Sequence, residues 1–210
     1  MLVPLSRAAV LGLAALVATS GIAAPMAAAA ATVTIDVRGP DGRPLADAAV
    51  TIETSGHAPI ISASMLHGPY VMEQRSIAFQ PHVLVVPVGA AVSFPNRDPV
   101  RHHVYSFSRA KRFDLKLYGR EEQRSVVFDR PGVVALGCNI HDSMSGFIIV
   151  SASPYAARTD AAGRATLTDV PPGAARLTIW STAIARPDNM LAQPIVVAAS
   201  GTAKTVAIGR

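Results

Sequence analysis

The sequence GCNIHDSMSG, residues 137–146, places Cys138, His141 and Met144 on one short segment with the spacing C-x2-H-x2-M. Apolar runs rich in β-branched and aromatic residues lie on both sides of it, at 133–136 and 147–150. Because short apolar runs of this kind form buried strands, we expect a loop that is held at both ends by a sheet. This loop would carry three side chains that can bind a metal.

A further histidine comes from an upstream stretch, FPNRDPVRHHV (94–104), in which His102 and His103 precede an apolar run. We expect Asn96 and Asp98 to cap the loop before these histidines. Two imidazoles, one thiolate and a weak axial thioether are the ligands of an electron-transfer copper site. Zinc favours a further cysteine, histidine or carboxylate over methionine, and calcium and magnesium require oxygen ligands. The residues therefore favour copper over these other metals.

The composition limits the classes of protein to which the chain can belong. The chain has 210 residues, of which 50% are hydrophobic and 16% charged, which excludes intrinsic disorder and allows one or two domains. Its single cysteine excludes an internal disulfide framework and any cluster that needs several thiolates. The sequence contains no G-x-S-x-G, no H-E-x-x-H and no phosphate-binding glycine loop, so we do not expect an enzyme.

Residues 1–30 have the pattern of a secretory signal peptide. Arg7 is their only charge, an apolar run follows at 8–18, and alanine-rich cleavage sites come after it. The run is too short to span a bilayer, although an uncleaved anchor is the alternative. We therefore expect a periplasmic protein with no membrane span in the mature chain. Because an oxidising compartment modifies exposed thiols, Cys138 should be either buried and inert or occupied by a metal.

The rest of the chain predicts an all-β protein, because short β-branched runs recur between turn residues and helical periodicity is almost absent. The expected strands are residues 33–37, 49–53, 83–88, 91–94, 104–108, 125–128, 133–136, 147–151, 165–167, 175–180, 195–198 and 205–208.

Two stretches share a similar pattern of turn residues and β-branched strand residues and lie about a hundred residues apart. They are DGRPLADAAVTI (41–52) and TDAAGRATLTDVPPGAARLTI (159–179). They resemble the opening and middle of the carboxypeptidase regulatory-like, or transthyretin-like, β-sandwich. The resemblance implies that 31–63 and 154–210 are halves of one such sandwich and that 64–153 is a domain inserted between them. An N-terminal arm followed by a separate C-terminal sandwich is the alternative.

The intervening region resembles a cupredoxin. The resemblance rests on FQPHVLVVPVG (79–89), FPNRD (94–98) and CNIHDSM (138–144), which are similar to plastocyanin, pseudoazurin and amicyanin. The longer string HHVYSFS…FDLKLY…FDRPGVVALGCNIHDSMSGFI looks like periplasmic cupredoxins of the methylamine-utilization type. It implies a Greek-key β-sandwich with one type 1 copper bound by His102, Cys138, His141 and Met144. His103 aligns with a position that is asparagine in many cupredoxins, and it is the alternative to His102 as ligand.

These observations predict a periplasmic type 1 (blue) copper protein that exchanges single electrons with periplasmic redox proteins. The resemblance implies an amine dehydrogenase as one such partner. A copper carrier or buffer with the same ligands, or a redox-silent binding or scaffold module, are the alternatives. Nucleic acid is not expected as a partner of an exported protein. A cluster of basic residues either steers an acidic partner or a membrane surface to the protein or serves only solubility: Arg109, Lys111, Arg112, Lys116, Arg120 and Arg124.

Overall fold

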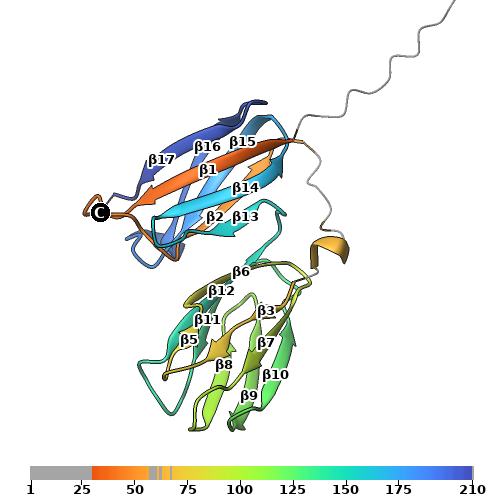
Figure 1. The fold of residues 1–210 in the computed structure, drawn as a ribbon, viewed down its shortest axis with the longest axis vertical. Coiled ribbons are helices and arrows are strands. Elements are labelled where there is room, and N and C mark those ends of the chain that lie inside the picture. The colour runs from red at the N-terminus through yellow and green to blue at the C-terminus, as the bar shows by residue number, and fades with distance from the viewer. Residues whose placement is uncertain (1–29, 57–60, 62, 67, 210) are drawn as a thin grey trace, which may run out of the picture.

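The computed structural model describes residues 30–56, 61, 63–66 and 68–209. The predicted signal peptide lies outside these residues, apart from its last one. The described chain is all-β, as the sequence predicts, and it forms two β-sandwiches that Figure 1 shows one above the other. In this part of the chain no helix is long and apolar enough to cross a bilayer. Two short 3-10 helices lie outside the strands, η1 (Ala63–Leu66) and η2 (Pro187–Asn189).

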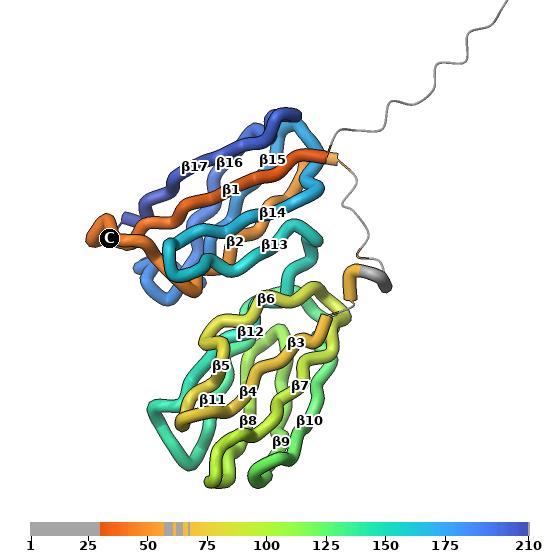
Figure 2. Tube along the Cα trace, viewed as in Figure 1, coloured from red at the N-terminus to blue at the C-terminus, as the bar shows by residue number. Residues whose placement is uncertain are grey.

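The upper sandwich joins the two ends of the described chain. A three-stranded sheet in the order β14-β1-β17 faces a four-stranded sheet in the order β13-β2-β15-β16. Figure 2 shows β1 lying between β14 and β17, antiparallel to the first and parallel to the second. The strands are β1 (Ala31–Arg38), β2 (Ala49–Thr54), β13 (Ala156–Arg158), β14 (Arg164–Val170), β15 (Gly173–Trp180), β16 (Met190–Val197) and β17 (Thr202–Ala207).

The alternation of buried and exposed residues along β1 shows which face of this strand packs inside the sandwich. Val33, Ile35 and Val37 are fully buried, and the residues between them are at least partly exposed, because successive side chains of a strand point to opposite faces. The buried face packs into a core that includes Ile52 of β2 and Leu177 of β15. Strands from 31–54 and from 156–207 therefore share one hydrophobic core.

The lower sandwich contains residues 137–146, which carry Cys138, His141 and Met144. A five-stranded sheet in the order β6-β12-β11-β8-β9 faces a three-stranded sheet in the order β10-β7-β3, with the pair β4-β5 beside them. The strands are β3 (Tyr70–Val71), β4 (Glu73–Gln74), β5 (Phe79–Gln80), β6 (Val83–Pro87), β7 (Ala91–Pro95), β8 (His102–Phe107), β9 (Arg112–Tyr118), β10 (Gln123–Val127), β11 (Gly132–Gly137) and β12 (Ser145–Ser151).

Each predicted strand overlaps an observed one, but β9 was not predicted. Its sequence, RFDLKLY, does alternate polar and apolar residues, yet its charged side chains belong to residue types that strands contain less often. The charged residues of β9 are tolerated because β9 is the edge strand of the five-stranded sheet, where charges discourage pairing with another chain. The short strands β3, β4, β5 and β13 were also not predicted.

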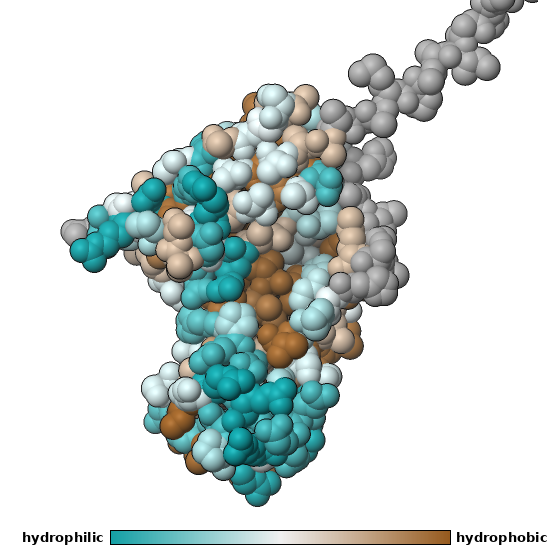
Figure 3. All heavy atoms as spheres, viewed as in Figure 1, coloured by the Kyte–Doolittle hydropathy of each residue, from teal (hydrophilic) through white to brown (hydrophobic). Residues whose placement is uncertain are grey.

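The two sandwiches meet through an apolar junction. Phe147 of β12 and Trp180 of β15 lie with ring centroids 4.9 Å apart. Ala49, Val83 and Ile149 belong to the same buried cluster as Trp180. Figure 3 shows apolar surface gathered at this waist, whereas the lower end of the second sandwich is mainly hydrophilic. The outer face of the five-stranded sheet is thus partly covered by the other sandwich.

Candidate metal centre

Three sequence-predicted side chains converge at one end of the five-stranded sheet. His102 is the first residue of β8, and Cys138 follows directly after the last residue of β11. His141 lies on the loop between β11 and β12. Because β8 and β11 are antiparallel neighbours, the start of β8 and the end of β11 lie at the same edge, although 36 positions separate His102 from Cys138.

The distances between the donor atoms suit a shared metal ion. Cys138 Sγ lies 4.0 Å from His102 Nδ1 and 3.9 Å from His141 Nδ1. The three ligand atoms all lie within 4.8 Å of one another. A sulfur that binds an ion at about 2.3 Å and a nitrogen that binds it at about 2.1 Å can be at most about 4.4 Å apart, so both sulfur–nitrogen distances fit. Nδ1 is therefore the nitrogen of each ring that faces the candidate site.

Met144, the predicted axial ligand, lies on the same loop as His141. Its side chain is buried and belongs to the same core cluster as Cys138, and its backbone N–H donates to the carbonyl of His141 at 2.9 Å. His102 is fully buried and Cys138 is nearly so, whereas His141 is half-buried. A soft thiolate and two imidazoles, with a buried methionine on the same loop, fit copper better than zinc or calcium.

A buried carboxylate holds the other side of the His102 ring. Asp98 Oδ2 lies 2.8 Å from His102 Nε2, and the backbone N–H groups of Ser76 and Ile77 donate to the same carboxylate at 2.6 and 2.9 Å. Burial opposes ionisation of Asp98, but the two amides and His102 outweigh it, so the pKa of Asp98 lies below its usual value. A proton on Nε2 leaves Nδ1 free to bind a metal.

The sequence predicts that Asn96 and Asp98 cap the loop before His102. This is confirmed for Asn96, whose Oδ1 accepts the N–H of Asp98 at 2.9 Å. The carboxylate of Asp98 instead contacts the amides of Ser76 and Ile77 and the ring of His102. The spacing of four residues between Asp98 and His102 is the signal that could have indicated the contact with the ring, since carboxylates commonly orient metal-binding histidines.

The structure also separates the two adjacent histidines. Because neighbouring residues of a strand point to opposite faces, His103 turns away from the centre, and its Nε2 lies 2.5 Å from Asp114 Oδ1 on β9. His102 is the histidine that the fold brings to Cys138 and His141.

Comparisons with known proteins find similar solved structures for part of the chain. Neither a protein-family model nor a curated protein sequence matches it. Similar solved structures include a purple cupredoxin from Nitrosopumilus maritimus, 24% identical, covering 39% of this chain and 96% of that one with a TM-score of 0.35. An oxidised mutant of amicyanin is 22% identical and covers 49% of this chain and 98% of that one, with a TM-score of 0.38.

A copper-containing nitrite reductase from Thermus scotoductus is 25% identical and covers 47% of this chain, with a TM-score of 0.38. This chain spans only 25% of the length of that enzyme. These neighbours are cupredoxins, and each match covers less than half of this chain.

Proposed function

We propose that this protein is a type 1 copper protein that transfers single electrons. His102, Cys138 and His141 would bind one copper ion per chain, and Met144 would be the weak axial ligand. The observation that carries this proposal is the pair of sulfur–nitrogen distances, 4.0 and 3.9 Å, from one thiolate to an imidazole on β8 and an imidazole on the loop after β11. The donor set matches that of blue-copper sites.

The chain's own residues suit electron transfer better than catalysis. Bound copper would supply a one-electron change between Cu(I) and Cu(II). The strand ends and Asp98 hold the donors in place, so the ligands need to move little when the charge of the ion changes. Four protein donors would leave no position for a substrate, so we propose no enzymatic activity.

We expect the electron to pass through His141, because it is more exposed than His102 and Cys138. It is half-buried, and Ile140 beside it is 49% exposed. Val100, on the loop before β8, is another exposed apolar residue, at 42%. Exposed apolar residues close in sequence to the two histidine ligands fit brief contact with a redox protein, because small apolar surfaces bind without high affinity.

The location and the domain organisation belong to the same proposal. We infer that residues 1–30 direct export and that the protein acts in the periplasm with other redox proteins. We also infer that 64–153 form a copper domain inserted between 31–63 and 154–210. The pairing of β1 with β14 and β17 supports this division, because the first strand completes a sheet with strands that follow the copper domain.

The test is addition of Cu(II) to the metal-free full chain. We expect an intense thiolate-to-copper absorption band and the EPR signal of a type 1 site, and we expect Cys138→Ser to abolish both. His102→Ala should weaken or remove the band, whereas the adjacent His103→Ala should retain it. A protein that gives no such band would contradict the proposal. Rapid loss of Cu(I) to an acceptor protein, with slow electron self-exchange, would favour a copper carrier instead.

A further inference from the structure

A groove of about 320 Å³ lies between the two sandwiches, beside their buried junction. This volume is within the range of small-molecule sites, about 300–1,000 Å³. One wall comes from β2, β15 and β16, and the other comes from β11, β12 and the loops at their ends. The side chains that matter here are Thr178, Trp180 and Met190 on the first wall, and Gly132, Val133 and Ile149 on the second. The groove therefore has a mainly apolar lining.

Glu53 is the only charged side chain among the described residues that line this groove. It is exposed, and its register partner on β15 is Arg176. Because register partners share a face of the sheet, the Glu53 carboxylate already has a positive charge close to it. Nothing else in the lining would attract a cation. The groove thus suits the apolar part of a ligand.

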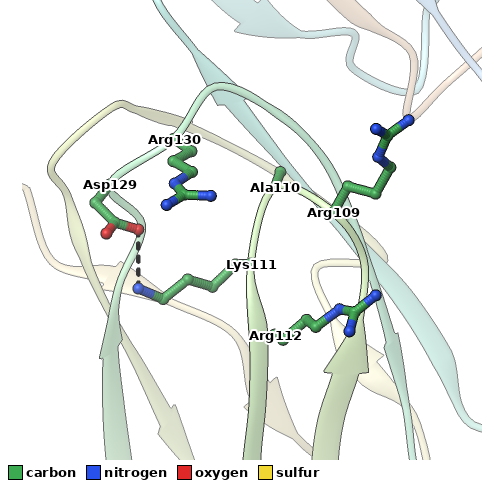
Figure 4. Close-up of a pocket in the computed structure, with 6 residues that line it drawn as sticks. All are labelled: Arg109, Ala110, Lys111, Arg112, Asp129 and Arg130. Carbon is green, nitrogen blue, oxygen red and sulfur yellow. Dashed lines mark hydrogen bonds and ion pairs between the residues drawn. The ribbon is translucent and has the colours of Figure 1, made fainter.

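The groove borders the basic turn of the β8–β9 hairpin. A Cβ atom at Gly132 would lie 3.1 Å from Cβ of Ala110, which stands between Arg109 and Lys111. Figure 4 shows the hollow that surrounds Ala110, of about 430 Å³. Positive charge therefore lies next to one end of the apolar lining.

Two arginines of this hollow are free to bind an anion. Figure 4 shows Arg109 and Arg112 pointing to the same side of the hairpin, whereas Lys111 pairs with Asp129 on the other side. Among the described residues no carboxylate lies within ion-pair distance of Arg109 or Arg112. Guanidinium groups form charge-assisted and often bidentate hydrogen bonds with carboxylates.

The outer face of the five-stranded sheet connects the groove to these arginines. Tyr105 of β8 is the register partner of Gly137 of β11, and its ring packs where a Cβ of that glycine would lie, 2.8 Å away. Register partners share a face, and so do alternate residues of one strand. Val133, four residues before Gly137, therefore lies on the face of Tyr105. Phe107, two residues after Tyr105, lies there too, and its register partner on β9 is Arg112.

From these features we propose that the groove between the sandwiches binds a single-chain anionic amphiphile, a free long-chain fatty acid. Its alkyl chain lies against Trp180 and Ile149, and its carboxylate lies at Arg109 and Arg112. Removal of the alkyl chain from water supplies most of the affinity, and the arginines select the charge of the head. None of these residues is a proposed copper ligand, so the site does not depend on the metal.

The test uses the full chain, in which Trp180 is the only tryptophan. The probe is 12-bromododecanoic acid, below the concentration at which it forms micelles, because bromine quenches indole fluorescence on contact. We expect saturable quenching. The isomer 2-bromododecanoic acid carries bromine beside the carboxylate and should quench clearly less. Quenching that does not saturate, or equal quenching by both isomers, would overturn the inference.

Calorimetric titration with dodecanoate tests the site of the carboxylate. Arg109→Gln/Arg112→Gln should raise the Kd about tenfold, because it removes the charge-assisted hydrogen bonds. Arg43→Gln/Lys204→Gln is the matched control, since it removes the same two charges from the other sandwich. It should leave the Kd unchanged. Equal weakening by both pairs would indicate attraction by net charge alone, and no weakening by the first pair would also overturn the inference.

Further variants and probes test the groove itself. Thr178→Phe fills the groove and should weaken binding of dodecanoate. Val196→Phe adds the same ring to the same sheet at a residue that is 71% exposed and outside the groove, and it should not weaken binding. Equal Kd values for the two variants would contradict the site.

The charge of the head and the source of the ligand need separate measurements. Dodecyltrimethylammonium has the same alkyl chain and should bind clearly more weakly than dodecanoate. Equal or tighter binding would indicate Glu53 as the partner of the head and would overturn the inference. Binding to anionic phospholipid vesicles without binding of monomeric dodecanoate would overturn it too, because the ligand would then be a membrane surface.

The blue band distinguishes this inference from the proposed function. If the chain binds dodecanoate but gives no band with Cu(II), the groove site stands and the proposed function fails. If the chain gives the band but no heat of binding and no quenching, the copper centre stands and only the groove site is wrong.

Discussion

At the scale of single residues, the two nitrogen atoms of His102 have different environments. Nδ1 faces Cys138, and Nε2 lies beside the buried carboxylate of Asp98. Ser76 and Ile77, whose amides hold that carboxylate, both have positive φ angles, 57° and 55°. Non-glycine residues adopt this conformation at a cost of about 1–2 kcal/mol each, so the turn that holds Asp98 is maintained by its surroundings.

The role of Asp98 predicts the effect of Asp98→Asn. Loss of the carboxylate weakens the orientation of His102, and we expect the affinity for Cu(I) to fall about 10- to 100-fold while a weaker blue band persists. Competition with a Cu(I) chelator measures the change. Asp114→Asn is the matched control, because Asp114 contacts His103 rather than His102. Equal affinities in all three proteins would show that Asp98 does not position the ligand.

At the scale of elements, a cross-strand ion pair links β1 to β14. Asp36 and Arg164 are register partners, and Arg164 donates two hydrogen bonds to the Asp36 carboxylate, at 2.8 and 3.1 Å. The hydrogen bond from Arg164 lowers the pKa of Asp36 despite some desolvation. Positions 36 and 164 are far apart in the chain, so this pair helps to hold the N-terminal strand in register.

This pair predicts a pH-dependent effect of Asp36→Asn. Because the pKa of Asp36 is lower in the folded than in the unfolded protein, its stabilising effect is complete above about pH 4. It is lost as the pH falls through the folded-state pKa. The variant should therefore unfold at a lower temperature than the unchanged protein at pH 7, and the difference should shrink in acid. A difference that is constant with pH would contradict the ion pair as its cause.

A glycine in the turn before β14 leads to a prediction about the free energy of unfolding. Gly163 has φ +75°, and a Cβ there would lie 2.5 Å from the carbonyl oxygen of Val37. Gly42 has nearly the same φ, +78°, but nothing lies within 4 Å. Gly42→Ala should cost about 1 kcal/mol from the backbone conformation alone, and Gly163→Ala should cost clearly more. Chemical denaturation measures both, and equal losses would show that the close approach is unimportant.

At the scale of the whole molecule, the junction between the sandwiches determines whether they unfold together. Trp180 is 4% exposed and packs against Phe147 of the other sandwich. The buried cluster around it combines side chains from both sandwiches. The sandwiches have separate cores, so this cluster is a main apolar link between them.

Trp180→Ala should destabilise the protein by about 3–5 kcal/mol, because it removes a large buried side chain. We expect calorimetry to show one transition in the unchanged protein and two in the variant, with the blue band of the copper-loaded form retained. Trp180→Phe, which keeps a ring, should give a smaller loss. A variant that still unfolds in one transition would show that other contacts couple the sandwiches.

Local sequence was sufficient for twelve of the strands, and it places three of the four predicted donors on one loop. Apolar runs mark buried strands wherever they occur, and Cys138, His141 and Met144 lie within one loop, so their proximity follows from the chain itself. The all-β class follows from the same runs. An edge strand such as β9, rich in charge, carries a weaker signal because half of its side chains face solvent.

Only the tertiary structure decided which histidine faces Cys138, what holds that histidine, and which ring touches the chain next to the sulfur. His102 and His103 are adjacent in sequence, and the side of the sheet that packs inward determines which of them reaches the thiolate. The contacts of Asp98 with Ser76 and of Tyr105 with Gly137 join segments that are distant in sequence. Such pairings depend on sheet order and register, which are properties of the assembled fold rather than of any local stretch.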